Sequence, residues 1–533
     1  MTASALERFE SQPLAEVATP ELYQRNLFRV LGVPVGAGVK EIRRRQKRLD
    51  MMRKLGTADS EPVCDGLLAL PETDDDAVRS ALEHVNDPKA RFVDEFFWFW
   101  PMDGEAANDS ALLALEQGDL NAAIRIWSVD DGDLEQRAVA VHNRAVLNHL
   151  VAMEYEKRVL TAKKEGATLS PTETVLKHTE RLWQRALEDW RATIHDDAFW
   201  HTVKQRVAEH DDKQLTTGFV HRLRQALPEA ILRTSADLAL RLAEVGDADK
   251  ARQQVAHMQA AWNSNNEVMR ALRDALAPVR DRLENLATSA RERAKNDQEH
   301  AAWHAWELLN QADPGLALVD ALLPENDPVR TAIHDDVVDA ANLCQVAYGN
   351  KTEDWKGTLD LIDRILLIVA GEHQKERIEG NREVVQKNLD ASQCFFCGEE
   401  QADPDVGIEV KMYGDVRQSY EQLKWRLTTV TVPRCRHCAE LRSANADFGS
   451  AAFKVGAAFG FLVVFLTIFI NFGKSGTDMV GLVFLSAVVG LIGAFLAGRF
   501  LELSFPEEHG FPEIKKLRKD GWRFGESPPE ASN

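Results

Sequence analysis

Two pairs of cysteines near the C-terminus have the composition and spacing of a metal site. Each pair is a Cys-x-x-Cys motif, formed by Cys394 with Cys397 and by Cys435 with Cys438. Because a tight knuckle presents both sulfurs of a pair to one ion, the two pairs can supply the four thiolates of a tetrahedral zinc. A closed set of four ligands leaves no position for water, so we expect zinc as a structural cofactor. A redox dithiol is the alternative, but it requires only one pair.

The residues around these cysteines indicate how they are positioned. Gly398 follows the first pair and permits the tight turn of a metal-binding knuckle. The segments GIEVKMYG and LTTVTVP between the pairs alternate in part, which is typical of short strands. We therefore expect residues 391–442 to form a small zinc-ribbon-like module. His437 lies within the second pair and is expected to be exposed, since the cysteines already complete the ligand set.

A second group of potentially reactive residues is the sequence His-Asp-Asp, which begins at His195, His210 and His334. Histidine and aspartate together can bind metals or move protons, so a hydrolase built from these clusters is one alternative. In TIHDDAFWHTVKQRV, however, the acidic pair precedes an amphipathic run, where aspartate caps a helix. The sequence contains no Gly-rich phosphate loop, HExxH or GxSxG motif. We therefore expect no catalytic residues and no enzyme.

The balance of charge bears on the kind of partner. The chain of 533 residues carries 64 Lys and Arg against 84 Asp and Glu, a net charge of −20. Phosphate binding requires a basic surface, so nucleic acid is not favoured as a partner. The first residues, MTASALERFESQPLAEV, contain no apolar core run, so we expect no secretory signal peptide and a largely cytosolic chain. The length indicates several domains.

Two long apolar runs follow the second cysteine pair. Residues 455–472 and 479–497 contain no charged residue, and the polar turn GKSGTD connects them. Runs of this length can span a bilayer as helices, and the flanking Lys and Arg residues favour the cytoplasmic side. The pattern predicts a transmembrane hairpin over residues 455–497, a lipid bilayer as partner, and a two-pass protein of the inner or plasma membrane with both termini cytoplasmic. Two buried helices of a soluble domain are the alternative. Residues 498–533 would form a basic cytosolic tail.

The middle of the chain, residues 102–390, has an almost entirely helical pattern that is rich in Ala, Leu, Arg, Glu and Gln. The segments EQGDLNAAIRIW and EVGDADKARQQV share a Gly-Asp pair followed by a nearby Ala. In tetratricopeptide-like units, Gly allows the tight turn between paired helices and a small Ala lets the second helix pack closely. We therefore expect an irregular, tetratricopeptide-like stack of helix pairs whose surface binds protein partners.

Residues 21–101, which follow an N-terminal tail at 1–20, contain the pattern of a known family. The segment NLFRVLGVPVGAGVKEIRRRQKRL suggests two helices, of which the second is basic. The segment AVRSALEHVNDPKARFVDEF continues with an apolar run, Asp-Pro, a basic residue and Arg. These features resemble the J domain, the module of DnaJ-type co-chaperones that engages Hsp70. The resemblance makes an Hsp70-type chaperone a candidate partner. It would be contacted by the basic residues of the second helix, namely Arg43, Arg44, Arg45, Lys47 and Arg48.

The chain departs from the J-domain pattern at the loop between the second and third helices. A working J domain carries His-Pro-Asp there, whereas residues 50–76 contain no His. We therefore expect no stimulation of the Hsp70 ATPase by the usual route. The order of the segments is similar to that of bacterial J-domain-like membrane proteins of unassigned function, from which no activity carries over.

Together these features predict a mostly α chain with a J-like helical module, an irregular helix-pair stack, a small zinc ribbon and a two-helix transmembrane hairpin. The predicted function is a membrane-anchored, cytosol-facing scaffold for protein interactions or a divergent J-like co-chaperone. Besides the hydrolase, a protein that binds nucleic acid through the basic second helix and the ribbon is an alternative. The run FFWFW at 96–100 is expected to be buried against the helices after residue 102, because so much aromatic surface is unfavourable in water.

Overall fold

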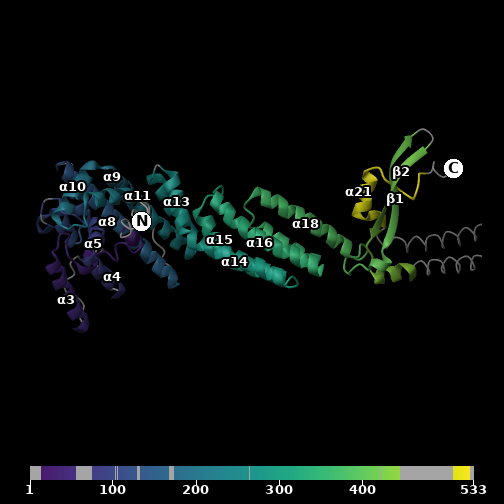
Figure 1. The fold of residues 1–533 in the computed structure, drawn as a ribbon, viewed down its shortest axis with the longest axis horizontal. Coiled ribbons are helices and arrows are strands. Elements are labelled where there is room, and N and C mark those ends of the chain that lie inside the picture. Colours follow the sequence, from purple (N-terminus) through teal and green to yellow (C-terminus); the bar gives the residue numbers. More distant parts are fainter. Residues whose placement is uncertain are drawn as a thin grey trace, which may run out of the picture. The chain divides into compact units, whose positions relative to one another are not determined.

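The computed structural model describes residues 14–55, 75–102, 104, 106–128, 132–166, 173–262, 264–419, 422–444 and 508–528. These residues form a mostly helical protein with one small sheet, which confirms the predicted predominance of helices (Figure 1). The chain divides into two compact units. The first comprises residues 1–293, 303–341 and 368–371, and the second comprises the remainder.

The described part of residues 21–101, the predicted J-like module, contains four helices. They are α2 (Leu27–Leu31), α3 (Val39–Leu55), α4 (Asp75–Asn86) and α5 (Pro88–Phe96). The side chain of Asn26 accepts hydrogen bonds from the first N–H groups of α2, and Gly32 ends that helix with a left-handed φ of 59°. Asp87 caps α5 in the same way, and Pro88 occupies its first turn. A proline costs no hydrogen bond there, because that N–H has no partner within the helix.

Helices also make up the region that follows. Their bounds are η2 (Ala106–Asn108), α6 (Ser110–Glu116), α7 (Leu120–Trp127), α8 (Leu134–Lys164), α9 (Glu173–His195), α10 (Asp197–Glu209), α11 (Thr217–Glu244), α12 (Ala248–Ala261), α13 (Asn265–Ala275), α14 (Ala277–Asn296), α15 (Ala301–Leu322), α16 (Pro328–Thr352), α17 (Trp355–Leu366) and α18 (Glu372–Ser392). Neighbours in sequence pack as pairs in several places, such as α6 with α7, α8 with α9, α11 with α12 and α17 with α18.

The two Gly-Asp segments form the helix pairs that their sequence predicts. Gly118, with a φ of 76°, turns the chain between α6 and α7, and the side chain of Asp119 caps α7. Ala123 is fully buried, as expected of the small residue at the crossing of two helices. Gly246, with a φ of 80°, and Asp247 repeat this arrangement between α11 and α12. Both turns need glycine because a side chain at these φ values would be strained.

The aromatic run at 96–100 lies in the core of the first unit, as predicted. All five rings are buried, with Trp98 the most exposed at 9%. Phe96 stacks on Trp200 with ring centroids 5.8 Å apart, and Trp100 stacks on Phe199 at 5.5 Å. These two stacked ring pairs hold the C-terminal end of α5 and the residues after it against α10. Residues 96–100, at the end of the predicted J-like module, therefore share one aromatic core with the helices that follow.

Two consecutive carboxylates on α5, those of Asp94 and Glu95, add polar contacts between this helix and the helices around it. Asp94 is 1% exposed and lies 2.7 Å from Nδ1 of His84 on α4. Glu95 is fully buried and accepts hydrogen bonds from Nε of Arg206 at 2.8 Å and Nε2 of His210 at 3.0 Å. Burial opposes ionisation of Glu95, but the hydrogen bond from His210 and the charge of Arg206 hold its pKa below the ordinary value.

The second unit contains the sheet. Besides α17 and α18, the second unit contains the elements of the sheet and those next to it. They are η3 (Pro404–Val406), β1 (Ile408–Ser419), β2 (Gln422–Val432), η4 (Glu508–Gly510), α21 (Pro512–Lys519) and β3 (Arg523–Phe524). The strand order is β2-β1-β3, and both pairings are antiparallel. Ile408 lies opposite Val432 at one end of the hairpin, and the register shifts between Gly414 and Arg417.

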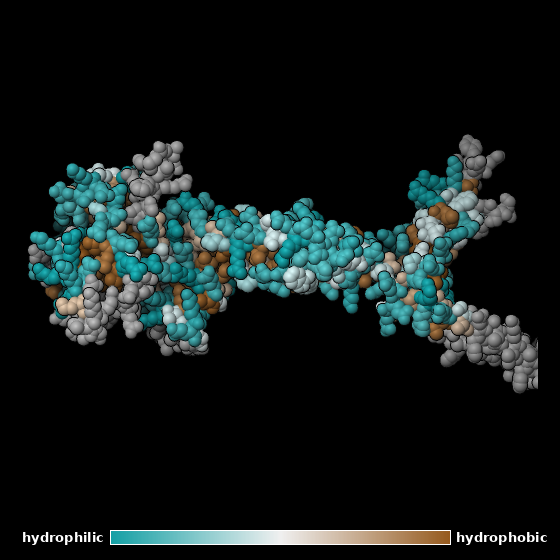
Figure 2. All heavy atoms as spheres, turned by 60° about the horizontal axis from the view of Figure 1, so that its bottom comes forward, coloured by the Kyte–Doolittle hydropathy of each residue, from teal (hydrophilic) through white to brown (hydrophobic). Residues whose placement is uncertain are grey.

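The predicted transmembrane hairpin and the two-pass membrane location are contradicted. No helix in the described ranges is long and apolar enough to cross a membrane. The face of the molecule in Figure 2 is largely hydrophilic, with smaller groups of hydrophobic side chains. The fold class is therefore corrected to a mostly helical chain with a small sheet. Residues 455–497, to which the hairpin was assigned, lie outside the described residues.

Two buried histidines predict that the first unit loses stability in acid. Nε2 of His142 lies 2.7 Å from the carbonyl oxygen of Phe96, and burial lowers the pKa of this imidazole to about 4. Nδ1 of His149 accepts a hydrogen bond from the indole of Trp190, and burial lowers the pKa of His149 to about 3. Below the ordinary value of 6.5 the unfolded chain therefore binds more protons than the folded one. The free energy of unfolding should fall as the pH decreases from 6.5 toward about 4, by up to roughly 3 kcal/mol for His142.

Urea unfolding at pH 7 and pH 5 measures this effect. The variant His142→Gln should show a smaller loss of stability between the two pH values than the wild type, whatever its stability at pH 7. The variant His195→Gln makes the same substitution at an exposed histidine and serves as the matched control. If the free energy of unfolding falls equally between pH 7 and pH 5 in the wild type and in His142→Gln, His142 does not cause the pH dependence.

Candidate metal centre

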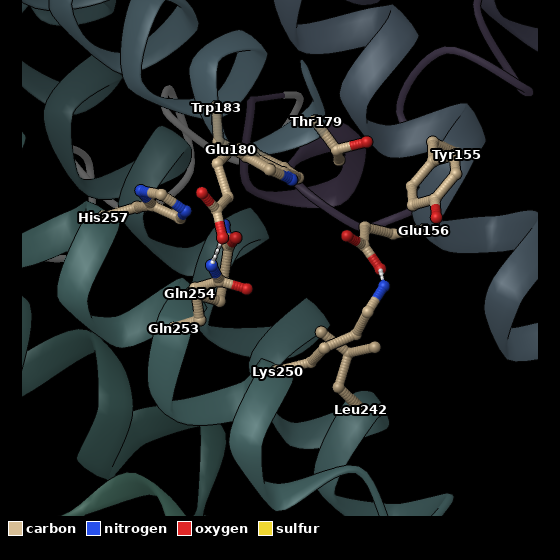
Figure 3. Close-up of a pocket in the computed structure, with 10 residues that line it drawn as sticks. All are labelled: Tyr155, Glu156, Thr179, Glu180, Trp183, Leu242, Lys250, Gln253, Gln254 and His257. Carbon is tan, nitrogen blue, oxygen red and sulfur yellow. Dashed lines mark hydrogen bonds and ion pairs between the residues drawn. The ribbon is translucent and has the colours of Figure 1, made fainter. Parts of the chain in front are cut away.

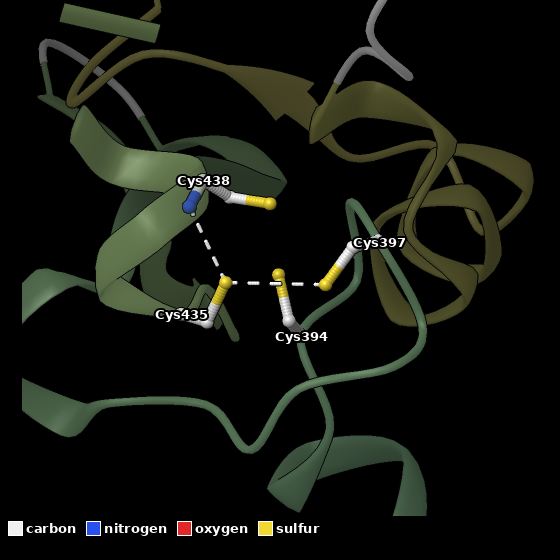
Figure 4. A group of neighbouring side chains, drawn as sticks. All are labelled: Cys394, Cys397, Cys435 and Cys438. Atoms are coloured by element: carbon white, nitrogen blue, oxygen red, sulfur yellow. Dashed lines mark hydrogen bonds between the residues drawn. The ribbon is translucent and has the colours of Figure 1, made fainter. Parts of the chain in front are cut away.

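The four cysteines predicted as metal ligands come together in the second unit. Their Sγ atoms all lie within 4.8 Å of one another (Figure 4). The Sγ atoms of Cys397 and Cys435 are 3.9 Å apart. Four sulfurs bound tetrahedrally to one zinc would be about 3.8 Å apart, because each Zn–S bond is about 2.3 Å long. Cys394 and Cys438 are buried with Cys435, whereas Cys397 is exposed. The cluster therefore has the size and donor chemistry of a site for one metal ion.

The first pair lies in a loop that follows α18. The N–H of Gly398 donates to the carbonyl of Cys394 at 2.8 Å, and Gly398 has a φ of 69°. This tight turn brings the two thiols of the pair to one side, as the sequence predicts. The N–H of Phe395 donates to the carbonyl of Pro433 at 2.8 Å. That bond joins the first pair to the segment that carries the second pair.

The second pair lies at the start of a helix over 436–444. Cys435 immediately precedes this helix, and the N–H of Cys438 points to its Sγ at a distance of 3.3 Å. Helix N-termini favour negative charge, so this position suits a thiolate. The guanidinium of Arg436 holds the first loop through the carboxylate of Asp403 at 2.8 Å. His437 is exposed, as predicted.

The thiols differ in how readily they ionise. Burial disfavours the thiolate of Cys394, but hydrogen bonds from the backbone of Cys435, Cys397 and Phe396 together lower its pKa to about 7. Burial raises the pKa of Cys438 to about 11 and raises that of Cys435 as well. Several thiolates in one buried cluster repel one another, and a divalent cation compensates that repulsion while it displaces the protons.

The C-terminal residues complete the module, which the sequence did not indicate. Phe511 and Ile514 are buried in one core with side chains of both long strands. The ring of Phe511 packs edge-on against Phe395, next to the first cysteine, at 5.3 Å. Trp522 covers Gly414, where a Cβ atom would lie 2.4 Å from the indole. Residues 508–528, expected in a basic tail, therefore contribute Phe511 and Ile514 to the core of the ribbon module. The helical spacing of apolar residues in FPEIKKLRK is the signal that could have indicated this.

The His-Asp-Asp segments take structural roles. His195 and His210 lie at opposite ends of α10, so a helix length of about 20 Å separates them. Asp196 caps α10, as the sequence predicts. His334 lies 2.9 Å from the carboxylate of Asp320 on α15. Within the part of the chain that the structure describes, the four cysteines are the one group of three or more His, Cys, Asp and Glu residues close enough to share a metal ion.

The basic residues predicted as a partner surface lie on α3. Arg43, Arg44, Lys47 and Arg48 are exposed. Arg45 is half-buried and its Nε donates to the carbonyl of Leu31, 2.9 Å away. Four of the five predicted residues are therefore accessible to a partner, and the fifth helps to hold the helix to α2.

Comparison with known proteins identifies no relative. No family model matches the chain, and neither a curated protein nor a solved structure matches it. The four-thiol cluster and the basic face of α3 are therefore the features of the chain that bear on its function.

Proposed function

We propose that this chain is a non-enzymatic scaffold for protein interactions, in which a structural zinc ion fixes the ribbon module and a J-like module offers a basic helix to an acidic partner. An Hsp70-type chaperone is the candidate partner. The observation that carries the proposal is the closed set of four thiols, all within 4.8 Å of one another.

Zinc is favoured by the chemistry of the donors. Thiolates are soft ligands, and four of them in a tetrahedral arrangement select zinc or iron over magnesium, calcium and manganese. Each cysteine offers one sulfur, so the set is complete without water or substrate. A complete set supports a structural role, since catalytic zinc sites keep one position open. The ion would hold together the two knuckles, which share the hydrogen bond from Phe395 to Pro433.

The interaction role is supported by the charge and exposure of α3. The chain as a whole has a net charge of −20, yet Arg43, Arg44, Lys47 and Arg48 are exposed on this one helix. The segment before α3 is held by Arg91 of α5, which donates to the carbonyl of Ala37 at 2.7 Å. A basic face on an anchored helix suits an acidic protein surface, because complementary charge speeds association and sets orientation.

Reversing the charge of this face should weaken chaperone binding. The triple variant Arg43→Glu, Arg44→Glu, Lys47→Glu is expected to raise the Kd for a purified Hsp70-type chaperone with ATP by at least about tenfold. The wild-type affinity should fall with added salt, because these charges are exposed and screened. Surface plasmon resonance at two salt concentrations measures both effects. We expect little stimulation of the chaperone ATPase, since residues 50–76 contain no His.

A matched control separates this face from the overall charge. The triple variant Arg270→Glu, Arg280→Glu, Arg282→Glu makes the same change at exposed positions of α13 and α14 and should leave the affinity unchanged. Equal weakening in both triple variants, no binding by the wild type, or strong ATPase stimulation would each contradict the proposed role. Salt-sensitive binding of nucleic acid that only the α3 variant loses would favour the nucleic-acid alternative instead.

A further inference from the structure

The space between α8, α9, α11 and α12 in the first unit is too small for a ligand. Two polar contacts line it, one between Glu156 and Lys250 and one between Glu180 and Gln253 (Figure 3). The space has room for about one water molecule. The ribbon module, in contrast, presents an open surface, which is the outer edge of its sheet.

Strand β2 forms this open edge (Figure 1). The strand order is β2-β1-β3, so β1 pairs with one side of β2, and among the described residues no strand pairs with the other side. Sheet edges usually carry charged residues, prolines or bulges that prevent pairing with another chain. Residues 427–432, LTTVTV, contain no charged residue and no proline, and their register with β1 is regular. This half of the strand is therefore unprotected against an added strand.

Three residues of β2 direct their backbone groups to this edge. The N–H of Gly525 donates to the carbonyl of Lys411 at 3.0 Å, so Lys411 turns its backbone groups away from β2. Thr429, which lies opposite Lys411, therefore belongs to a non-hydrogen-bonded pair, and its own N–H and C=O point to the open edge. Because this orientation alternates along a strand, Leu427 and Thr431 point theirs the same way. All three residues are exposed, and each offers one donor and one acceptor to an added strand.

We propose that β2 is a dimerisation edge, which pairs antiparallel with β2 of a second copy of this chain. Leu427 is the middle residue of β2, which spans Gln422–Val432, so a twofold axis at Leu427 pairs the two strands over their whole length. The two Leu427 residues would exchange backbone hydrogen bonds, and their side chains, each 51% exposed, would cover one another. The sheet would continue across the axis in the order β3-β1-β2-β2-β1-β3.

The charges of β2 suit a second copy in this register. Lys424 and Arg426 would lie opposite Val430 and Thr428 of the second copy, so no two like charges face each other directly. Arg426 is also compensated within its own chain by the carboxylate of Asp415, 3.3 Å away. The strand is thus complementary to itself. Dimerisation would give one assembly two copies of the basic helix α3, which adds to the proposed scaffold role without depending on it.

Sedimentation velocity of the full-length, zinc-loaded protein tests the proposal. The wild type should change from monomer to dimer between about 1 and 200 µM. Leu427→Lys places two ammonium groups opposite each other at the axis and should raise the Kd of the dimer at least about tenfold. Val416→Lys makes the same kind of change at an apolar residue of β1 that is 47% exposed and lies outside the edge. It is the matched control and should dimerise as the wild type does.

Two further measurements show whether residue 427 of one copy meets residue 427 of the other. Leu427→Glu should also dimerise weakly, whereas an equimolar mixture of Leu427→Lys and Leu427→Glu should associate at least about tenfold more tightly than either variant alone. Hydrogen exchange of residues 422–432 in the wild type should slow as the protein concentration rises, because the outward amides gain acceptors. Thermal unfolding of each variant identifies any that fails to fold.

Three results would overturn the proposal. They are a wild type that stays monomeric up to about 200 µM, an unchanged Kd in folded Leu427→Lys, and a mixture that associates no more tightly than its components. Binding of an unrelated extended peptide at this edge by a monomeric wild type would also overturn it, because the edge would then belong to a different partner.

Discussion

The variant Cys435→Ser is expected to lose the bound metal and to unfold the ribbon module. Cys435 is 2% exposed and belongs to the thiol cluster, with its Sγ 3.9 Å from that of Cys397. A serine hydroxyl is a poor zinc ligand at neutral pH, so three thiolates would remain. Apparent binding free energies of structural zinc in small domains are about 10–16 kcal/mol, which exceeds the stability that a core of this size supplies alone.

Metal analysis and hydrogen exchange of the full-length protein measure this outcome. The wild type should contain one zinc per chain, and the variant close to none. Amides of β1 and β2 should exchange much faster in the variant, whereas those of α8 and α11 in the other unit should keep their protection. Chelation of the wild-type metal should reproduce the effect.

Cys344 provides the matched control for this experiment. It is a fully buried cysteine of α16 that lies outside the thiol cluster. Cys344→Ser places the same hydroxyl in a buried position, so it is expected to lower stability and to keep the metal. Full metal content in Cys435→Ser, or a wild-type ribbon that is folded and protected without metal, would contradict the proposed zinc centre.

The second large effect is expected at Glu95, where Glu95→Ala should destabilise the first unit by about 3–5 kcal/mol. The carboxylate is fully buried and accepts hydrogen bonds from Arg206 and His210. Arg206 also lies over the ring of Trp100 at 4.5 Å, and its side chain is only 17% exposed. Removing the carboxylate therefore leaves a largely buried guanidinium without its counter-charge, and that penalty dominates the loss.

Chemical denaturation followed by tryptophan fluorescence measures the loss. Glu95→Gln keeps the shape and part of the hydrogen bonding, so it should lose less than Glu95→Ala. Glu135, whose side chain is 46% exposed and lies 3.8 Å from His201, is the control, and Glu135→Ala should cost less than about 1 kcal/mol. Because the pKa of Glu95 is lowered on folding, its contribution is present above its unfolded pKa and is lost as the pH falls through its folded pKa. If Glu95→Ala unfolds at the same denaturant concentration as Glu135→Ala, the buried pair does not stabilise the fold.

Local features of this chain could be predicted from the sequence because nearby residues determine them. Gly118 and Asp119 specify a turn and a helix cap within a few residues, and the structure contains both. The cysteine pairs likewise carry their own knuckle geometry, so only the approach of one pair to the other depended on the fold. The burial of the aromatic run at 96–100 followed from its area alone, which is unfavourable in water whatever the topology.

Features that depend on distant residues could not be predicted. In the sequence, Glu95 looks like an ordinary charged helix residue. Its partners Arg206 and His210 lie more than a hundred residues away, and only the folded chain places α10 beside it. The contribution of residues 508–528 to the ribbon core could not be predicted for the same reason. The short helix α21 is buried only against β1 and β2, which lie much earlier in the sequence. The membrane hairpin was predicted only from the length of two apolar runs. None of the helices that the structure describes is long and apolar enough to support it.

The return of the C-terminal segment to the ribbon has a consequence for chain topology. The side chains of Arg442 and Glu508 form an ion pair at 2.8 Å, close to where the described chain leaves the module and where it re-enters. The described chain therefore leaves the ribbon module and re-enters it at adjacent points. The Arg442–Glu508 ion pair therefore joins two segments of the ribbon module that are far apart in the sequence, and it holds the described ends of the module together.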